Sequence, residues 1–136
     1  MRDPELRTLA LDRVGGGGTV IVDAAIEPHP AIPTLLNTGG RGTEFARSVV
    51  LDRGGPGPER LGASVSGADV LGERVGAAIL AVGGVRIAVD SLAVRDGMED
   101  PQGMVGMDVL RGTVLGCTAD PAGRVVWQLP PDRYLD

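Results

Sequence analysis

The order of apolar and polar residues along the chain predicts many short β-strands and almost no helix. Short apolar runs, rich in β-branched residues, alternate with turns that contain Gly or Pro, which is the pattern of strands joined by tight connections. We expect strands at Thr19–Ile26, Thr34–Asn37, Ser48–Leu51, Arg60–Ser66, Val75–Val82, Val85–Val94, Met104–Val105, Gly112–Ala119 and Arg124–Leu129.

Two of the turns carry hairpin signals, and one segment favours a helix. Gly83-Gly84 and Asp120-Pro121-Ala122-Gly123 each separate two apolar runs, as in β-hairpins. Met107–Gly112 predicts one short helix, with Asp108 as its cap and Gly112 at its end. About nine short strands with so little helix predict an all-β domain, either a closed barrel or a sandwich.

Composition narrows the partners that this domain can have. Aromatic residues make up only 2% of the 136 residues, so the core must consist of Val, Leu, Ile, Ala and Met. All 13 basic residues are Arg, they are interspersed with acids, and the net charge is −5. Binding to phosphate backbones needs clustered positive charge, so nucleic acid is not an expected partner. Abundant Gly, Ala, Val and Arg without Lys suggests a bacterial source.

The single cysteine and single histidine exclude several kinds of site. Cys117 cannot form an internal disulfide, and we expect it to fill space in a buried strand. His29 lies between two prolines, far from Cys117, and this spacing fits no zinc site. No apolar run approaches the roughly 20 residues that span a bilayer, so we expect a cytoplasmic protein with no membrane segment.

Two segments stand out when they are taken together. The first is TLLNTGGRGTEF, Thr34–Phe45, in which Asn37 is the only asparagine of a chain with twelve aspartates. The second is GMVGMDVLRGTVLGCT, Gly103–Thr118. Each alone is a common strand end with a glycine turn, but their order and spacing in an all-β chain of this length are much more specific.

Together these segments resemble the retropepsin-like aspartic proteases. In that family a strand ends in two apolar residues followed by Asp-Thr/Ser-Gly-Ala, with Ser or Thr three residues later. Leu35–Thr43 fits this pattern except that Asn37 stands where the catalytic Asp belongs and Gly40 where Ala is usual. Met104–Leu110 matches the family's apolar pair, Gly and short helix. The resemblance covers about residues 18–130.

The resemblance implies a fold, an activity and an assembly. The implied fold is a single retropepsin-like domain over residues 1–136, with its core at 18–130. It is a closed β-barrel with a flap hairpin and one short helix near the C-terminus. The implied activity is that of an aspartic endopeptidase, in which two carboxyl groups about 3 Å apart share a proton and activate a water. With one such turn per chain, the pair requires a homodimer, and Arg7–Val14 is a candidate interface strand.

The resemblance also implies which residues form the site. Asn37 marks the acid/base position, and Thr38 and Gly39 shape its turn. Substrate contacts are expected from Gly40 and from a flap at Ala63–Gly72, namely Ser66, Gly67, Ala68 and Val70. No cofactor and no metal are implied. Contacts of Arg41, Glu44 or Arg111 are candidates for bracing the turn or the dimer, and Trp127 and Tyr134 for the core or the interface.

Asn37 leaves three explanations open, because an amide can neither take a proton from water nor share one with a partner. The first is an engineered Asp-to-Asn change that inactivates a peptide-holding enzyme. The second is natural loss of proteolysis, with the dimer cleft binding or converting a small apolar ligand in a lyase or cyclase type of reaction. The third is a purely structural turn. Gly40 in place of Ala tilts slightly toward the natural case.

Overall fold

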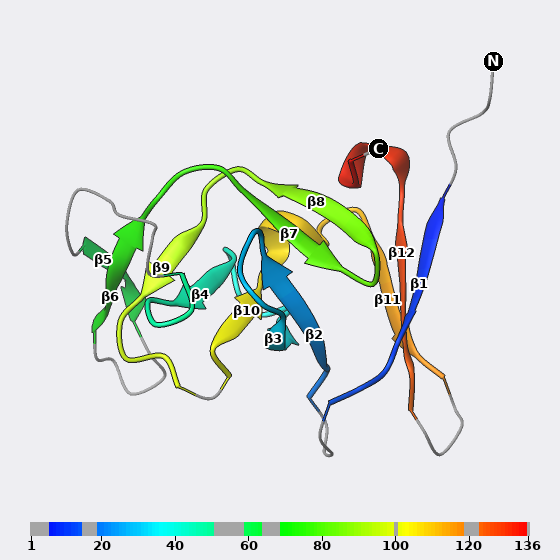
Figure 1. Ribbon diagram of the computed structural model, residues 1–136, viewed down its shortest axis with the longest axis horizontal. Coiled ribbons are helices and arrows are strands. Elements are labelled where there is room, and N and C mark those ends of the chain that lie inside the picture. The colour runs from blue at the N-terminus through cyan, green and yellow to red at the C-terminus, as the bar shows by residue number, and fades with distance from the viewer. Residues whose placement is uncertain are drawn as a thin grey trace.

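The computed structural model describes residues 6–14, 19–50, 59–63, 69–99, 101–118 and 123–135, with only the backbone of 59–63 and 69–71. Within this part of the chain, the elements are short strands, one helical turn and one 3-10 turn (Figure 1). They are β1 Arg7–Leu11, β2 Ile21–Ile26, β3 Ile32–Leu36, β4 Glu44–Ala46, β5 Glu59–Ala63, β6 Asp69–Arg74, β7 Ala78–Val82, β8 Val85–Val89, β9 Ala93–Arg95, β10 Gly103–Val105, α1 Met107–Leu110, β11 Val114–Cys117, β12 Val125–Leu129 and η1 Pro131–Arg133.

Nine of the strands form one sheet, in the order β5-β6-β9-β4-β10-β3-β2-β7-β8. β2 pairs with β3 through its first four residues and with β7 through Ala25 and Ile26, so it connects two parts of the sheet. Among the described residues, no ladder joins β5 to β8. The chain is therefore mostly β with one short helix, as predicted, but the closed barrel is not found in the part that the structure describes.

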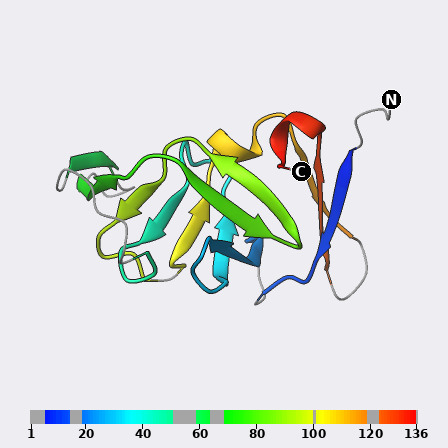
Figure 2. The same cartoon turned by 45° about the horizontal axis from the view of Figure 1, so that its top comes forward.

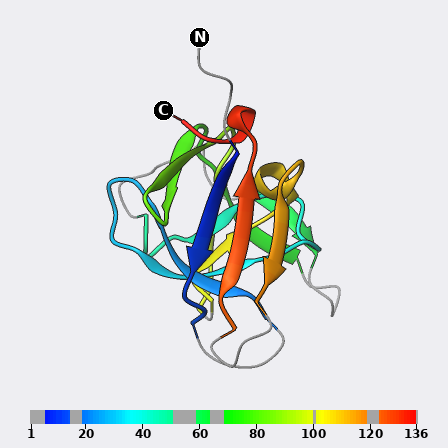
Figure 3. The same ribbon diagram turned by 90° about the vertical axis from the view of Figure 1, so that its right-hand side faces the viewer.

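The remaining three strands form a separate sheet in the order β1-β12-β11, which Figure 3 shows side by side. Figures 1 and 2 place this sheet at one end of the molecule and the β5–β6 hairpin at the other. One face of the small sheet packs on the common core through Leu9, Val125, Trp127 and Leu129. β1 thus pairs with β12 of its own chain, and Trp127 belongs to the core.

The β7–β8 hairpin confirms the Gly83-Gly84 prediction. Its residues pair from Ala78↔Val89 to Val82↔Val85, and both strands alternate between buried and more exposed positions. Gly83 has φ +56, and a Cβ there would lie 2.7 Å from Leu11 Cδ2 on β1. The positive φ of this turn therefore favours glycine, and Gly83 also lies against Leu11 of the small sheet.

The predicted strand at Ser48–Leu51 and the predicted burial of Cys117 are both wrong. Ser48–Leu51 is not a strand within its described residues: Val49 and Val50 close tight turns by donating to the carbonyls of Ala46 and Arg47. Val50 is fully buried from that turn, so its apolar character reflects core packing and not strand pairing. The strand of this region is β4, one segment earlier.

Cys117 is the second correction, because it is exposed. β11 is an edge strand that pairs with β12 on one side only. Cys117 is aligned with the buried Val125, yet it lies at the open edge, beyond which none of the described strands pairs. A sequence pattern reports the alternation of side chains along a strand but not whether the strand is central or at an edge.

Candidate active site

The segment that contains Asn37 connects two strands that are not neighbours in the sheet. β3 ends at Leu36 and β4 begins at Glu44, and β10 lies between them, parallel to β3 and antiparallel to β4. The connection, residues 37–43, therefore has to cross over the end of β10; we call it the Asn37 turn. This insertion of β10 brings the two sequence segments singled out above into contact.

Backbone hydrogen bonds hold the Asn37 turn on the segment that follows β10. The Asn37 N–H donates to the Val105 carbonyl at 2.8 Å. In the other direction, the N–H groups of Met107 and Asp108 donate to the carbonyls of Gly40 at 2.8 Å and Arg41 at 3.0 Å. The turn is thus attached at its beginning and in its middle, which limits its freedom to move.

The end of the Asn37 turn is attached through side chains. The Thr43 hydroxyl donates to Asp108 Oδ1 at 2.8 Å, and the Thr43 N–H donates to Asp108 Oδ2 at 3.1 Å. Thr43 is fully buried. The residue at the N-cap of α1 is Gly106, which makes no side-chain cap, so Asp108 is not the N-cap residue. Asp108 lies in the first turn of α1, where its Oδ1 accepts the Val109 N–H at 2.9 Å as well as the Thr43 hydroxyl.

Gly106 is required by the close approach of the two segments. A Cβ at this position would lie 2.4 Å from the carbonyl oxygen of Gly42 and 2.8 Å from its nitrogen. Both are backbone atoms that the hydrogen bonds around them hold in place. The glycine after the apolar pair Met104-Val105 is therefore explained by packing against the Asn37 turn.

The Asn37 side chain is half-buried and has both of its polar atoms paired. Oδ1 accepts the N–H of Gly39 at 3.0 Å, and Nδ2 donates to the thioether sulfur of Met104 on β10 at 3.2 Å. Because the Gly39 N–H needs an acceptor, the amide is oriented with its oxygen toward the turn and its NH₂ toward Met104. A carboxylate at position 37 could accept the same Gly39 N–H.

Gly40, the second departure from the retropepsin pattern, is in contact with the amide. A Cβ at Gly40 would lie 3.0 Å from Asn37 Nδ2. Few real Cβ contacts are that short, so alanine here would require the amide to shift. The two departures, at positions 37 and 40, are thus neighbours in space as well as in sequence.

The structure describes only some of the other predicted site residues. Thr38 and Gly39 are exposed at the tip of the Asn37 turn. The predicted flap lies where an antiparallel pair, β5 and β6, is found, but Ser66, Gly67 and Ala68 lie outside the described residues. Val70 aligns with Gly62 across this hairpin. Contact of these residues with substrate stays a prediction.

Glu44 lies directly after the Asn37 turn, and its partners differ from those expected. Burial raises the pKa of the Glu44 carboxyl, and the positive charges of Arg95 and Arg74 oppose that rise. Arg41 and Arg111, the arginines proposed from sequence, are exposed. Sequence reasoning named Glu44 only as a possible brace, because its environment depends on the strands that pair beside β4.

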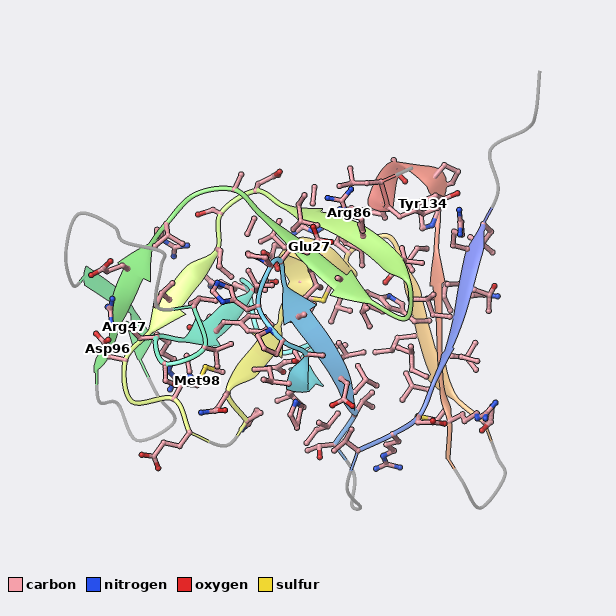
Figure 4. The ribbon with its side chains drawn as sticks, viewed as in Figure 1. Glu27, Arg47, Arg86, Asp96, Met98 and Tyr134 are labelled. Carbon is pink, nitrogen blue, oxygen red and sulfur yellow. The ribbon has the colours of Figure 1, made fainter. Side chains whose placement is uncertain are left out.

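Ion pairs farther from Asn37 connect the strands around it. Arg47 follows β4 and pairs with Asp96 at 2.6 Å and with Glu73 of β6 at 3.3 Å. Figure 4 shows Arg47 and Asp96 at the β5–β6 end of the molecule, away from Glu27, which pairs with Arg86 of β8 at 2.9 Å. These contacts attach the β5–β6 hairpin to the segment that leaves the Asn37 turn.

A cleft of about 380 Å³ borders the Asn37 turn on the side of α1 and the C-terminal residues. Arg41, Asp90, Asp108 and Arg133 are among the residues that line it, so its charges are mixed. In the described part of the chain, no three His, Cys, Asp or Glu side chains gather in a way that could hold a metal ion. None of its helices is long and apolar enough to cross a membrane.

Comparison with solved structures supports the architecture. The chain is similar to the crystal structure of a retropepsin-like aspartic protease from Rickettsia conorii, with a TM-score of 0.59 over 96% of this chain and 97% of that one. The sequence identity is 12%, so the likeness shows the fold alone. No family model and no curated protein sequence matches the chain. The chain therefore has a retropepsin-like fold, as its two segments predicted.

Proposed function

We propose that this chain is one half of a homodimeric site of the aspartic endopeptidase type, in which two Asn37 turns hold a peptide. The observation that carries the proposal is the position of the residue 37 side chain. The Asn37 side chain projects from a turn that is attached to β10 and α1, and its Oδ1 accepts the Gly39 N–H at 3.0 Å. Preorganisation of this kind is what a positioned acid–base group needs.

The reaction expected of such a site depends on the residue at position 37. With Asp on both chains, one carboxylate takes a proton from water while the other carboxylic acid protonates the peptide carbonyl, and no covalent intermediate forms. Asn can orient the water but cannot accept its proton. We therefore propose that the Asn37 protein binds peptides and hydrolyses them slower by at least about 10²–10⁴-fold than its Asp counterpart.

The free edge of β11 is our candidate for sealing the dimer. The Thr118 N–H donates to Arg124, so the backbone groups of Thr118, Gly116 and Val114 face β12, while those of Leu115 and Cys117 face outward. β11 carries no charge and no proline, the features that usually protect an edge strand from pairing. Pairing with the β11 of a second copy would join the two small sheets.

The experiment that tests the protease proposal is the substitution Asn37→Asp. We expect acid-favoured cleavage of a broad peptide library, inhibited by pepstatin, with Asn37→Ala as the inactive control. Sedimentation and circular dichroism establish that each variant is folded and dimeric. A folded, dimeric Asn37→Asp protein that cleaves no peptide would contradict the proposal.

One observation favours a second function, a naturally non-proteolytic site for a small apolar ligand. Asn37 Nδ2 donates to Met104 Sδ, a contact that a carboxylate cannot make, and Gly40 leaves room for that NH₂ group. Calorimetry with a library of small apolar compounds tests this alternative. It predicts that the Asn37 protein binds such a compound and that Asn37→Asp abolishes this binding. The protease proposal predicts that neither protein binds these compounds and that Asn37→Asp cleaves peptides.

A further inference from the structure

The strands beside the Asn37 turn align three side chains in one row. Met104 of β10 is opposite Leu35 of β3 on one side and opposite Glu44 of β4 on the other. Residues opposite one another on neighbouring strands project from the same face of a sheet, with Cβ atoms roughly 4.5–5.5 Å apart. Leu35, Met104 and Glu44 therefore form one continuous row, which we call the Glu44 row.

The Glu44 row lies on the less buried face of this part of the sheet, although Ala93, which is opposite Glu44 on β9, is buried. The neighbouring row on the opposite face, Thr34, Gly103 and Phe45, is buried. There a Cβ on Gly103 would collide with both Phe45 and Thr34, which shows how tightly that face is packed. The three members of the Glu44 row are all half-buried instead. These three side chains therefore keep accessible surface that a ligand can contact.

Met104 connects the Glu44 row to the candidate catalytic position. Its sulfur accepts the Asn37 amide at 3.2 Å, so a molecule seated at Asn37 also meets the Glu44 row. Leu35 and Met104 offer an apolar floor, and Glu44 places one carboxyl group at the end of it. A ligand side chain that complements this arrangement has an aliphatic stem and a cationic end.

Two arginines lie close to Glu44, but on one side only. In the sheet order, β9 with Arg95 and β6 with Arg74 lie beyond β4, on the side away from Met104. An ionised carboxylate has about four acceptor positions, so it can serve these arginines and a donor that approaches along Met104. The partial burial of Glu44 strengthens such a contact because less water screens it.

We propose that Leu35, Met104 and Glu44 form a subsite for a guanidinium or ammonium side chain of the bound ligand, beside Asn37. The inference rests on the proposed peptide-binding function and names the kind of side chain that the site selects. It assigns Glu44 a role in specificity and not in proton transfer. In this role the carboxylate binds the cation while the floor binds the stem.

The test measures how tightly two peptide pools bind to the unmodified Asn37 protein. The pools are identical except that one contains Arg where the other contains citrulline, its uncharged isostere. We expect about a tenfold preference or more for Arg, the size of a hydrogen bond to a charged group. Glu44→Gln keeps the shape and should abolish the preference. Glu99→Gln, the same change at an exposed position, should retain it. Equal binding of both pools, or a preference that survives Glu44→Gln, overturns the proposal.

A small probe separates the subsite from the peptide-binding function. Butylguanidinium and, as its uncharged control, butylurea are each titrated into the protein. The NMR signal of the Met104 methyl group is followed, and this signal is assigned by its loss in Met104→Leu. If neither peptide pool binds, the proposed peptide-binding function fails. The subsite is still supported if butylguanidinium, but not butylurea, shifts the Met104 methyl signal and if Glu44→Gln abolishes that shift. Absence of any such shift, with no peptide selection, overturns the subsite itself.

Discussion

The buried hydroxyl of Thr43 donates to Asp108 Oδ1 at 2.8 Å across 65 residues of sequence. This bond joins the end of the Asn37 turn to the first turn of α1. Together with the backbone bonds from Met107 and Asp108, it makes one unit of the two segments that carry the retropepsin resemblance. The rigidity of the candidate site is therefore a property of this junction, and it can be measured without knowing the substrate.

Thr43→Val should weaken this junction. The substitution keeps the shape but removes the hydroxyl, which leaves Asp108 Oδ1 and the Gly106 N–H without their Thr43 partner. We expect the free energy of unfolding to fall by about 1–3 kcal/mol, measured by urea denaturation. Thr8→Val on the exposed face of β1 is the matched control, and an equal loss in both variants would contradict this account.

Gly106→Ala should be more damaging than an ordinary glycine substitution. Its Cβ would meet the Gly42 backbone at 2.4 Å, so the Asn37 turn has to move away from α1. We expect the free energy of unfolding to fall by about 1–3 kcal/mol or more, and the midpoint of thermal unfolding to fall with it. Gly116→Ala, where no atom lies within 4 Å of the new Cβ, should change the midpoint little. Similar midpoints for the two variants would refute the close packing.

Glu44 should make stability depend on pH in a defined direction. Burial raises the folded pKa of its carboxyl above the ordinary value of a glutamate, so the folded state holds the proton more tightly than the unfolded chain. Stability is then lost as the pH rises from about the unfolded pKa through the folded one. Relative to the unmodified protein, Glu44→Gln should gain stability over that window, measured by urea denaturation at several pH values. A difference that does not vary with pH would show that Glu44 titrates normally.

Cys117 offers a test of the β11 edge. If two copies pair there, a short bis-maleimide should join Cys117 to its copy, and Cys117→Ser should abolish the product. Cys117→Pro removes an N–H that faces away from β12, so it should weaken the dimer in sedimentation without disrupting the small sheet. A dimer unchanged by Cys117→Pro would place the interface elsewhere.

Several features of this protein follow from local sequence. The Gly83-Gly84 hairpin and the helical turn after Gly106 were predicted from the chain, and both are found. The strand predicted at Thr34–Asn37 is found two residues earlier at its start and one residue shorter at its end, as β3, Ile32–Leu36. These features depend on residues close in sequence: turn glycines, apolar runs and their spacing. The two motifs were sufficient to predict the fold that the comparison with a solved structure supports.

The tertiary structure decided which strands are neighbours, and with that the environment of each side chain. Cys117 is exposed because β11 is at an edge, and Val50 is buried from a turn and not from a strand. Asp108 holds Thr43, and Glu44 joins a row with Met104, because β10 inserts between β3 and β4. Periodicity along a chain determines which side chains alternate, whereas strand order and register are set by contacts between residues far apart in sequence.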